Sequence, residues 1–495
     1  MTPDFPILSL LVFLPLVAAL LLAALRPSQA LARGFALAVA LMELALATFP
    51  LLGSSPSGTY PGAPSGFFLF EDLPWIERFG IRYTLGMDGI SQIMVLLTSF
   101  ITVVAVLISW RQIKERSPVY YALLLALQCS IQGVFLSLDL FLFYLFFEAM
   151  LIPIVLLSGI WGDGRPVYSA VKFFLYTFVG SLLMLVSIIT LYLMHGAQTG
   201  SYTFALTALV QTSVPYGLAL WLFAGFLVAF AVKIPLFPLH SWQPDAYADA
   251  PIAGTLILAS LLSKTGAYGL IRFAYPLFPE AARAFTPVLY LAAVFVISYG
   301  AWIAFAQKDM KRLVAYSSLS HMGFIALGIA AWSPLALSGA LLQMVNHAVT
   351  TGALFVVVGM LDERAGSRDL AAYGGIWGKV PALSFFFLFF CMASAGLPGL
   401  NNFVGEFLVL LGAFKVAPAA ALGAFLGIVL TLIYTVRLVQ EVLFVRERKP
   451  LELKDLTMRE AGVLALLALV AVYLGVHPNP VLDLFKEPIA LLVSK

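Results

Sequence analysis

Six ionisable residues lie inside long apolar segments, where a charged side chain is costly and therefore informative. They are Glu148, Lys233, Lys264, His321, His347 and Glu406. A charge at the centre of a membrane-spanning helix costs at least about 2.5–3.5 kcal/mol, so such residues face protein or water and usually mark ion paths. Carboxylates, amines and imidazoles at similar depth can pass protons to one another without a cofactor. These residue types and positions predict proton transfer within a membrane.

Lys233 stands at the end of an apolar run, in FAVKIPLFPLHSW (230–242). Pro235 lacks an amide hydrogen and clashes with the preceding turn, so we expect the helix to break here and to free carbonyls for water or for the ammonium. Glu148 lies in FLFYLFFEAMLIPIVLLSGIW. Because a nearby carboxylate favours a protonated lysine and burial disfavours it, moving Glu148 relative to Lys233 would load or release a proton. The alternatives are a simple kink and a structural ion pair.

The two histidines are each followed or preceded by hydroxyl side chains at helical spacing. Ser317 lies four residues before His321, and Thr350 and Thr351 lie three and four residues after His347. Residues at these spacings share one face of a helix. The pattern predicts polar strips within apolar helices and a proton-path role for both histidines, with a satisfied core histidine as the alternative.

Three further charges differ in how strongly they indicate function. Lys264, in LILASLLSKTGAYGLI, is too deep in its span to reach the surface easily. Glu406 follows the broken segment GLPGLNNFVG, and a structural carboxylate is the alternative there. Lys172 begins a span and follows Arg165, so it is a further proton-path candidate with an interfacial anchor as the alternative.

These residues sit on an expected all-α polytopic membrane protein. Since roughly 20 apolar residues cross a bilayer as a helix, the chain has about fourteen spans. They are roughly 5–25, 31–52, 88–110, 119–137, 140–161, 168–194, 216–239, 250–275, 284–306, 312–332, 335–361, 379–411, 418–444 and 459–477. The run 379–411 is too long for one straight crossing, and SAGLPGLNN (394–402) is expected to interrupt it.

Basic residues predict the orientation. Lys and Arg gather in the odd-numbered loops, for example at Arg111, Lys114 and Arg446, whereas even-numbered loops hold few, such as Arg82 and Arg272. Cytoplasmic loops carry the excess of Lys and Arg. The odd loops should therefore be cytoplasmic, both termini and the long loop 53–87 should lie outside, and the chain should reside in the cell inner (cytoplasmic) membrane.

Composition excludes other classes of protein. Of 495 residues, 62% are hydrophobic and only 11% are charged, against about 25% charged in soluble domains. The net charge of +3 indicates no nucleic-acid binding, and any soluble catalytic machinery must belong to partner chains. Cys129 and Cys391 lie in apolar runs without a Cys/His cluster, so we expect no metal site, haem or iron–sulfur site.

Spans seven and twelve share a design, in which proline breaks an apolar run near an ionisable residue. The pairs are Pro235 with Lys233 and Pro398 with Glu406. Paired broken helices indicate inverted repeats. We therefore expect two inverted five-helix repeats with discontinuous helices 7 and 12. The repeats are helices 4–8 (119–275) and helices 9–13 (284–444). Helices 1–3 (1–110) precede them, and a final helix with a tail (459–495) follows.

Seven motifs, in order from about 119 to 444, resemble the antiporter-like subunits of respiratory complex I, the proton-translocating NADH–quinone oxidoreductase. They are LFYLFFEAMLIPIVLLSGIWG, RPVYSAVKFFLYTFVGSLLML, KIPLFPLHSWQPDAYADAP, LLSKTGAYGLIR, QKDMKRLVAYSSLSHMGFI, MVNHAVTTGALF and GLPGLNNFVGEFLVL. Glu406 resembles the carboxylate of the M type (chain 4 type), where the L and N types and Mrp-type antiporters tend to carry lysine.

The resemblance implies roles for single residues. Glu148 and Lys233 would be a regulatory ion pair, Lys264 the central proton carrier, and Glu406 the residue that serves the exit or the next subunit. The residues that link Lys264 to Glu406 would be His321 and His347. Tyr247 stands where many relatives have histidine, so no relay role is expected at that position.

The resemblance also implies the surroundings of the chain. Flavin, iron–sulfur clusters and quinone would belong to partner subunits, with no cofactor in this chain. The partners would be other complex I membrane subunits, including two further antiporter-like subunits, together with the lipid bilayer and protons. The alternatives are an Mrp-type cation/proton antiporter subunit, the equivalent module of a membrane-bound hydrogenase, and a scaffold that transports nothing.

Overall fold

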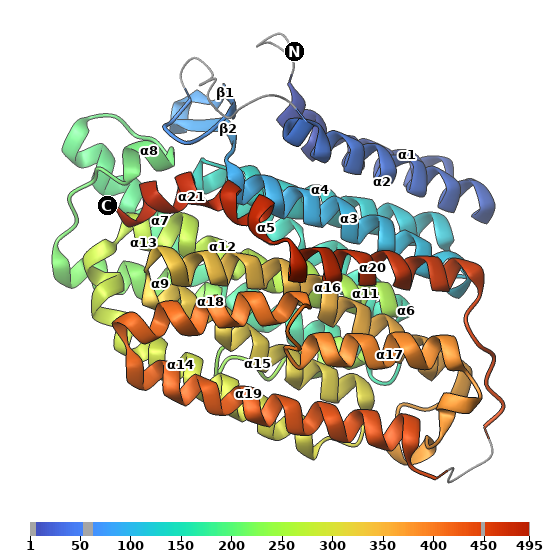
Figure 1. Cartoon of the computed structure of the whole chain (residues 1–495). Helices are drawn as coiled ribbons and strands as arrows, with labels where there is room; N and C mark the ends of the chain where they lie inside the picture. The colour runs from blue at the N-terminus through green and yellow to red at the C-terminus, as the bar shows by residue number, and fades with distance from the viewer. Residues whose placement is uncertain (1–5, 53–62, 447–450, 495) are drawn as a thin grey trace.

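The chain folds as a bundle of long helices that run side by side (Figure 1). The computed structural model describes residues 6–52, 63–446 and 451–494. The helices outside the span 252–277 are α1 (Ile7–Leu25), α2 (Gln29–Leu52), α3 (Gly89–Gln112), α4 (Ser117–Leu136), α5 (Leu140–Ala149), α6 (Leu151–Trp161), α7 (Pro166–Thr199), α8 (Leu206–Leu209), α9 (Tyr216–Lys233), α10 (Gln243–Asp249), α14 (Pro279–Ala306), α15 (Met310–Ala331), α16 (Pro334–Ala365), α17 (Pro381–Ser394), α18 (Asn401–Val416), α19 (Pro418–Val439), α20 (Met458–Val476) and α21 (Asn479–Val493). The expected all-α polytopic membrane fold is confirmed.

Thirteen helical segments of the described residues are long and apolar enough to cross a membrane. The crossing expected at 379–411 is divided between α17 and α18, which lie end to end along the molecule (Figure 1). Gly396 and Gly399 in the break have φ of +78° and +92°, values that side chains with a Cβ rarely adopt. The predicted interruption is confirmed, and glycine at these two positions allows the chain to turn between the half-helices.

The first predicted break lies directly after Lys233. Helix α9 ends at that residue, and α10 begins ten residues later, at Gln243. A second discontinuity, which the sequence did not suggest, lies at Met150 between α5 and α6. Glu148 and Lys233 therefore both lie within two residues of a helix end, where the backbone departs from regular helical geometry.

The span around Lys264 is not a regular α-helix. It consists of α11 (Ile252–Ile257), a π-helical turn at 258–262, α12 (Ser263–Gly269), a second π-helical turn at 270–274 and α13 (Tyr275–Leu277). We expected one plain helix here. Single π-helical turns within α-helices occur frequently at functional sites, and Lys264 lies two residues after the first of them.

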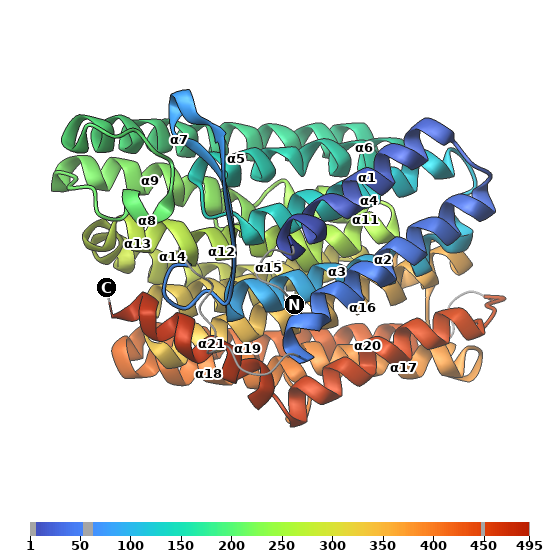
Figure 2. The ribbon, with the colours of Figure 1, turned by 90° about the horizontal axis from the view of Figure 1, so that it is seen from above.

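The helices that carry Lys264, His321 and His347 occupy the centre of the bundle. Seen from above, α11, α12, α15 and α16 lie between an edge formed by α6 and α7 and an opposite edge formed by α17 to α20 (Figure 2). In the spans at 252–277 and 334–365, every residue of the most apolar stretch is buried. In α20 only 28% of the residues of that stretch are buried. Such central helices can carry polar groups because lipid does not reach them.

The loop 53–87 contains more structure than expected. Strands β1 (Leu69–Ile76) and β2 (Ile81–Met87) form an antiparallel hairpin, and residues 53–62 lie outside the described part of the chain. The hairpin and the C-terminus lie at one end of the bundle, opposite the connection between α1 and α2 (Figure 1). The tail after α20 forms helix α21, which packs against α3 and α16.

One residue assigned to a loop lies inside the bundle. Arg272 is 5% exposed within the second π-helical turn, and its guanidinium lies 2.5 Å from Asp88 Oδ2 at the start of α3. The sequence assignment of Arg272 to an external loop was wrong, because a carboxylate 184 residues away in the chain compensates its charge.

Candidate functional site

Lys264 is fully buried at the centre of the bundle. Its ammonium lies 2.5 Å from the carbonyl of Ala259, which belongs to the first π-helical turn, and 3.3 Å from Ser263 Oγ. Its third neighbour is His347 Nδ1 of α16, at 2.5 Å. The π-helical turn therefore brings a backbone carbonyl to the lysine. The packing of α16 adds a titratable neighbour, the imidazole of His347.

The imidazoles of His347 and His321 continue from Lys264. His347 Nε2 lies 3.0 Å from Ser318 Oγ on α15, and His321 follows Ser318 by three residues on the same helix face. The two rings stand at a steep angle with centroids 5.9 Å apart. Each imidazole uses both of its nitrogens in hydrogen bonds, which is the geometry that allows a histidine to accept a proton at one nitrogen and release another.

Glu406 ends this series. Its Oε1 lies 2.7 Å from His321 Nδ1 and accepts a hydrogen bond of 3.1 Å from Gln343 Nε2. His321 Nε2 contacts Ser394 Oγ, 3.1 Å away, in the last residue of α17. The break between α17 and α18 thus supplies both polar neighbours of His321, one from each half-helix.

We name Lys264, His347, Ser318, His321 and Glu406 the central relay, which consists of two hydrogen-bonded groups, Lys264–His347–Ser318 and His321–Glu406, with imidazole ring centroids 5.9 Å apart. Sequence reasoning predicted four of its members, and the structure brings all of them together. Ser318 and Gln343 were missed, although Ser318 lies in the SSLSH motif that precedes His321. Asn346 and Asn401 were also missed, and they bond each other's backbone carbonyls at 2.7 and 3.0 Å and hold α18 against α16.

An apolar cavity of about 410 Å³ adjoins the relay at Glu406. Its walls come from α18 and α19 and include Phe403, Phe407 and Phe425. The carboxyl of Glu406 is 4% exposed. Glu406 is therefore the member of the relay that lies nearest to an edge of the bundle.

The surroundings of Lys233 differ from the expectation. Val232 O accepts from Trp242 Nε1 and Ala231 O accepts from Leu236 N, so neither carbonyl serves the ammonium. Lys233 Nζ has no hydrogen-bond partner among the described residues. The expectation that freed carbonyls bind the lysine was wrong, because the chain after the break folds back and takes those acceptors itself.

Two aromatic rings surround the Lys233 ammonium instead. The centroids of Phe147 and Phe173 lie 5.0 and 5.3 Å from Nζ, within the range of cation–π attraction. Phe147 is the chain neighbour of Glu148, whose Oε1 also has no hydrogen-bond partner in the described structure. The regulatory pairing of Glu148 with Lys233 stays a prediction, and in this structure an aromatic ring rather than a hydrogen bond joins the two regions.

Lys172 belongs to a charged cluster that the sequence did not reveal. Its Nζ lies 2.8 Å from Asp245 Oδ2, and Arg312 Nη2 lies 2.8 Å from Asp245 Oδ1. Burial disfavours the carboxylate, but the hydrogen bonds from Lys172 and Arg312 outweigh it and hold the pKa of Asp245 below its ordinary value. One carboxylate thereby joins α7, α10 and α15.

Tyr247 connects α10 to the span that carries Lys264. Its hydroxyl donates to the carbonyl of Leu258, at 3.1 Å, in the first π-helical turn. This contact gives the tyrosine a supporting role for the irregular helix. It is consistent with the expectation that the position takes no part in proton relay.

The described residues contain no group of three or more His, Cys, Asp and Glu side chains that could hold a metal ion. Glu43 on α2 is fully buried and was missed by sequence reasoning, although it interrupts the apolar run ALMELAL. It lies outside the central relay, and its surroundings are described below.

Similar proteins are known for nearly the whole chain. A family described as "NADH:quinone oxidoreductase/Mrp antiporter, TM" matches residues 137–432. NADH-quinone oxidoreductase subunit M from Pseudomonas aeruginosa is 45% identical over 430 residues, which cover 86% of this chain and 84% of that protein. The protein of the same name from Rhodobacter capsulatus is 40% identical over 504 residues, with coverage of 99% and 96%.

Solved structures show the same fold. A chain of respiratory complex I from Thermus thermophilus with bound NADH is 33% identical, with a TM-score of 0.87 and coverage of 98% of this chain and 99% of that one. A chain of the Mrp complex from Dietzia sp. DQ12-45-1b is 21% identical, with a TM-score of 0.84 and coverage of 98% and 97%. The second likeness concerns the fold alone.

Proposed function

The chain belongs to the NADH:quinone oxidoreductase/Mrp antiporter transmembrane family, and from this premise we propose that its central relay carries protons across the membrane. It acts as the M-type membrane subunit of a proton-translocating NADH–quinone oxidoreductase, whose redox reactions take place in partner subunits. The observation that carries the proposal is the pair of close contacts at the two ends of the relay, Lys264 with His347 and His321 with Glu406, with the two imidazole ring centroids 5.9 Å apart.

The chemistry of the five groups allows a proton to pass in either direction, and we take the order from Lys264 to Glu406 that the family resemblance implies. Lys264 can give a proton to His347 Nδ1 through their short contact, and His347 can release one at Nε2 toward the hydroxyl of Ser318. Rotation of that hydroxyl would pass the proton toward His321, which lies in contact with the carboxyl of Glu406. The relay then ends beside the apolar cavity, where Glu406 would hand the proton to the exit or to an adjoining subunit.

Lys233 and Glu148 would act as the switch that drives the relay. Lys233 lies in an aromatic and uncompensated setting, so its charge is sensitive to any carboxylate that approaches it. At an effective dielectric near 20, a contact pair contributes about 4 kcal/mol. Movement of the helix end that bears Glu148 would therefore be sufficient to change whether Lys233 holds a proton.

The same proposal covers location and orientation. The chain lies in a cell inner membrane. Its basic odd-numbered loops face the cytoplasm, and the hairpin and both termini lie on the outer side. The partners include further antiporter-like subunits, two by the family resemblance. The alternative of an Mrp-type antiporter subunit has the weaker support, since the relatives of 40% identity and above carry the oxidoreductase name.

Proton pumping by the reconstituted complex tests the proposal. Lys264→Ala, Lys233→Ala and Glu406→Ala should each lower the number of protons moved per electron, because each removes a titratable group from the path. Lys486→Ala is the matched control, since this lysine side chain is 75% exposed and pairs only with neighbouring Asp483 on α21. Full wild-type stoichiometry in the two relay variants, Lys264→Ala and Glu406→Ala, and in the switch variant Lys233→Ala would refute the proposal.

A further inference from the structure

Glu43 is a second buried acid that the central relay does not use. It is 0% exposed and lies fourteen residues after the start of α2 and nine before its end. Gln132 Nε2 of α4 donates to Glu43 Oε2 at 3.2 Å and to Ser99 Oγ of α3 at 3.1 Å. Three helices of the N-terminal unit therefore meet at one carboxyl group within the span.

Four polar atoms of Glu43 and of two amide side chains on α4 have no hydrogen-bond partner among the described residues. They are Glu43 Oε1, Gln132 Oε1 and both amide atoms of Gln128. Gln128 lies four residues before Gln132, so the two amides share one face of α4. Buried polar atoms are almost always bonded to protein or to ordered water, because an unpaired one costs about 1–3 kcal/mol. The group is polar enough to hold internal water.

No cation lies close enough to compensate an ionised Glu43. Helix α2 packs against α1, α3 and α4, and α1 has no titratable side chain. The titratable or charged groups on α2, α3 and α4 besides Glu43 are Arg33, Arg111, Tyr120, Tyr121 and Cys129. Arg33 lies ten residues from Glu43, about 15 Å along the helix, and its guanidinium bonds the carbonyl of Trp110. A buried carboxylate without a cation is unfavourable, whereas the neutral acid can donate a hydrogen bond.

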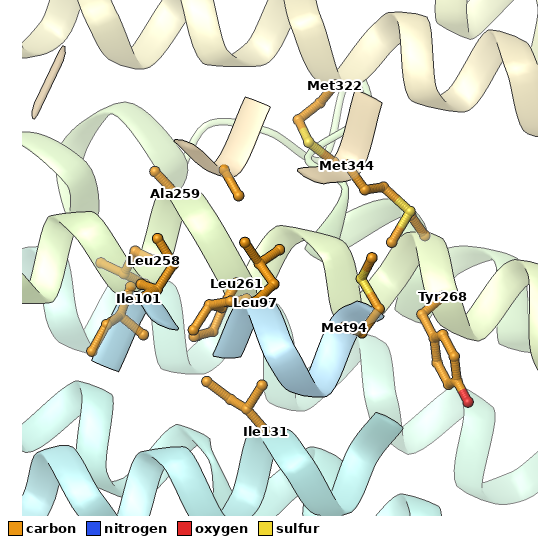
Figure 3. Packing of buried hydrophobic residues seen from close by; sticks show 14 of the residues in the cluster. Met94, Leu97, Ile101, Ile131, Leu258, Ala259, Leu261, Tyr268, Met322 and Met344 are labelled. Carbon is orange, nitrogen blue, oxygen red and sulfur yellow. The ribbon is translucent and has the colours of Figure 1, made fainter. Parts of the chain in front are cut away.

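An apolar layer separates Glu43 from the central relay. Leu97 and Ile101 of α3 and Ile131 of α4 pack toward Leu258 and Leu261 in the span that carries Lys264 (Figure 3). Ser99 lies two residues from Leu97 and Ile101, and Gln132 lies next to Ile131, so both are on other faces of their helices than the apolar layer. The Glu43 group is therefore not an extension of the contacts around Lys264.

We propose that Glu43, with Gln132, Ser99 and Gln128, forms a second proton-binding site, hydrated and separate from the central relay. A proton from bulk water binds to a carboxylate oxygen of Glu43, which becomes a hydroxyl and donates to internal water, while Gln132 keeps its bond to the other oxygen. The proton leaves a hydronium ion of the bulk phase, whose O–H bond breaks to leave water, one O–H bond forms on Glu43, and no electron moves. The N-terminal helices thus carry a proton of their own within the span.

Infrared difference spectroscopy of the intact complex tests this site. The wild-type minus Glu43→Gln spectrum at neutral pH should contain the carbonyl stretch of one protonated carboxylic acid, and that band should shift in D₂O because the site exchanges with water. Gln132→Leu should move the band to higher frequency, since one hydrogen bond to the carboxyl group is lost. Absence of the band, or a band that does not respond to D₂O, would overturn the proposal.

Two further variants keep the result independent of folding and of the relay. If Glu43→Gln prevents assembly of the complex, Glu43→Asp retains an acid and should displace the same band rather than remove it. Lys264→Met should leave the band unchanged, because the apolar layer separates the two groups. Loss of the band in Lys264→Met would show that Glu43 belongs to the relay and would refute a separate site, whatever the effect of that variant on pumping.

Discussion

Single residues in this protein owe their chemistry to partners that are distant in the chain. Lys264 meets His347 across 83 positions, and His321 meets Glu406 across 85. Within its own span each of these residues is an isolated polar group in apolar sequence. Together they compensate one another's desolvation, which explains how several titratable groups can be buried in one bundle.

Asp139 provides a test at the residue scale that lies outside the membrane-spanning helices. Its Oδ1 accepts from the amides of Phe141 and Leu142 and thereby caps α5. Burial nevertheless raises the pKa of Asp139 to about 6, because it outweighs these hydrogen bonds. With a pKa that is higher in the folded than in the unfolded state, the stabilising contribution of Asp139 is complete below about pH 4 and is lost as the pH rises through 6.

We therefore expect Asp139→Asn, which retains the cap but cannot ionise, to match the wild type near pH 4 and to exceed it above pH 6. The gain at neutral pH should be up to roughly 3 kcal/mol, or two pKa units. The midpoint of thermal unfolding of the purified complex, measured across this pH range, gives the result. Asp139→Ala is the control: it cannot ionise either, so its stability should follow the same pH dependence as that of Asp139→Asn but lie about 1 kcal/mol lower throughout, because it loses the cap. A pH-independent difference between Asp139→Asn and wild type would contradict the assignment.

Broken and irregular helices are the elements that position the relay. The break between α17 and α18 places Ser394 and Glu406 on opposite sides of His321, and a π-helical turn brings the carbonyl of Ala259 to Lys264. A straight helix would present only one face to the centre of the bundle. The discontinuities thus allow short stretches of backbone and side chain to converge where continuous helices could not.

Gly399 tests the geometry of this break at the element scale. Its φ of +92° strains any residue that has a Cβ, so Gly399→Ala should destabilise the subunit by about 1–2 kcal/mol. Gly378 is a matched control, because a Cβ at either glycine would meet no atom within 4 Å and Gly378 lacks the positive φ. Thermal unfolding of the two variants is the measurement, and an equal loss of stability would show that backbone strain at Gly399 is not the cause.

At the scale of the whole molecule, polarity increases from the lipid-facing edges toward the central helices. The helices with the relay are surrounded by others whose outer faces carry exposed apolar side chains, such as Leu291 on α14 and Trp221 on α9. The outward side chains are apolar because they contact lipid. Polar side chains lie in the centre because only neighbouring protein groups can satisfy their hydrogen bonds there. Helix α7 packs on α9 and α16 packs on α18, and the pair of inverted five-helix repeats stays a prediction.

Orientation in the membrane is testable with two single cysteines. Ser201, after α7, and Glu115, between α3 and α4, are both exposed and lie at opposite ends of the bundle. In intact cells, a thiol reagent that does not cross membranes should label Ser201→Cys, and it should label Glu115→Cys only after permeabilisation. The native Cys129 and Cys391 are buried and should contribute little background. The reverse labelling pattern would invert the proposed orientation.

The sequence alone determined the membrane class, both predicted breaks and most of the titratable residues. About fourteen crossings were expected, and thirteen helical segments of the described residues are long and apolar enough to cross a membrane. These follow from local properties, because hydropathy over about 20 residues reports a crossing and proline or glycine reports a break. The order of the motifs also indicated the family. The hairpin and the π-helical turns were missed, since no strong local signal marks them, whereas Glu43 was overlooked although it interrupts an apolar run.

Only the tertiary structure decided which groups meet. The sequence could not show that Arg272 pairs with Asp88, that Asp245 joins Lys172 to Arg312, or that Lys233 lies against aromatic rings rather than freed carbonyls. Contacts of this kind depend on how helices far apart in the chain pack and rotate against each other. The energy of a buried charge depends on the partners within a few ångströms, and only the packed bundle determines that environment.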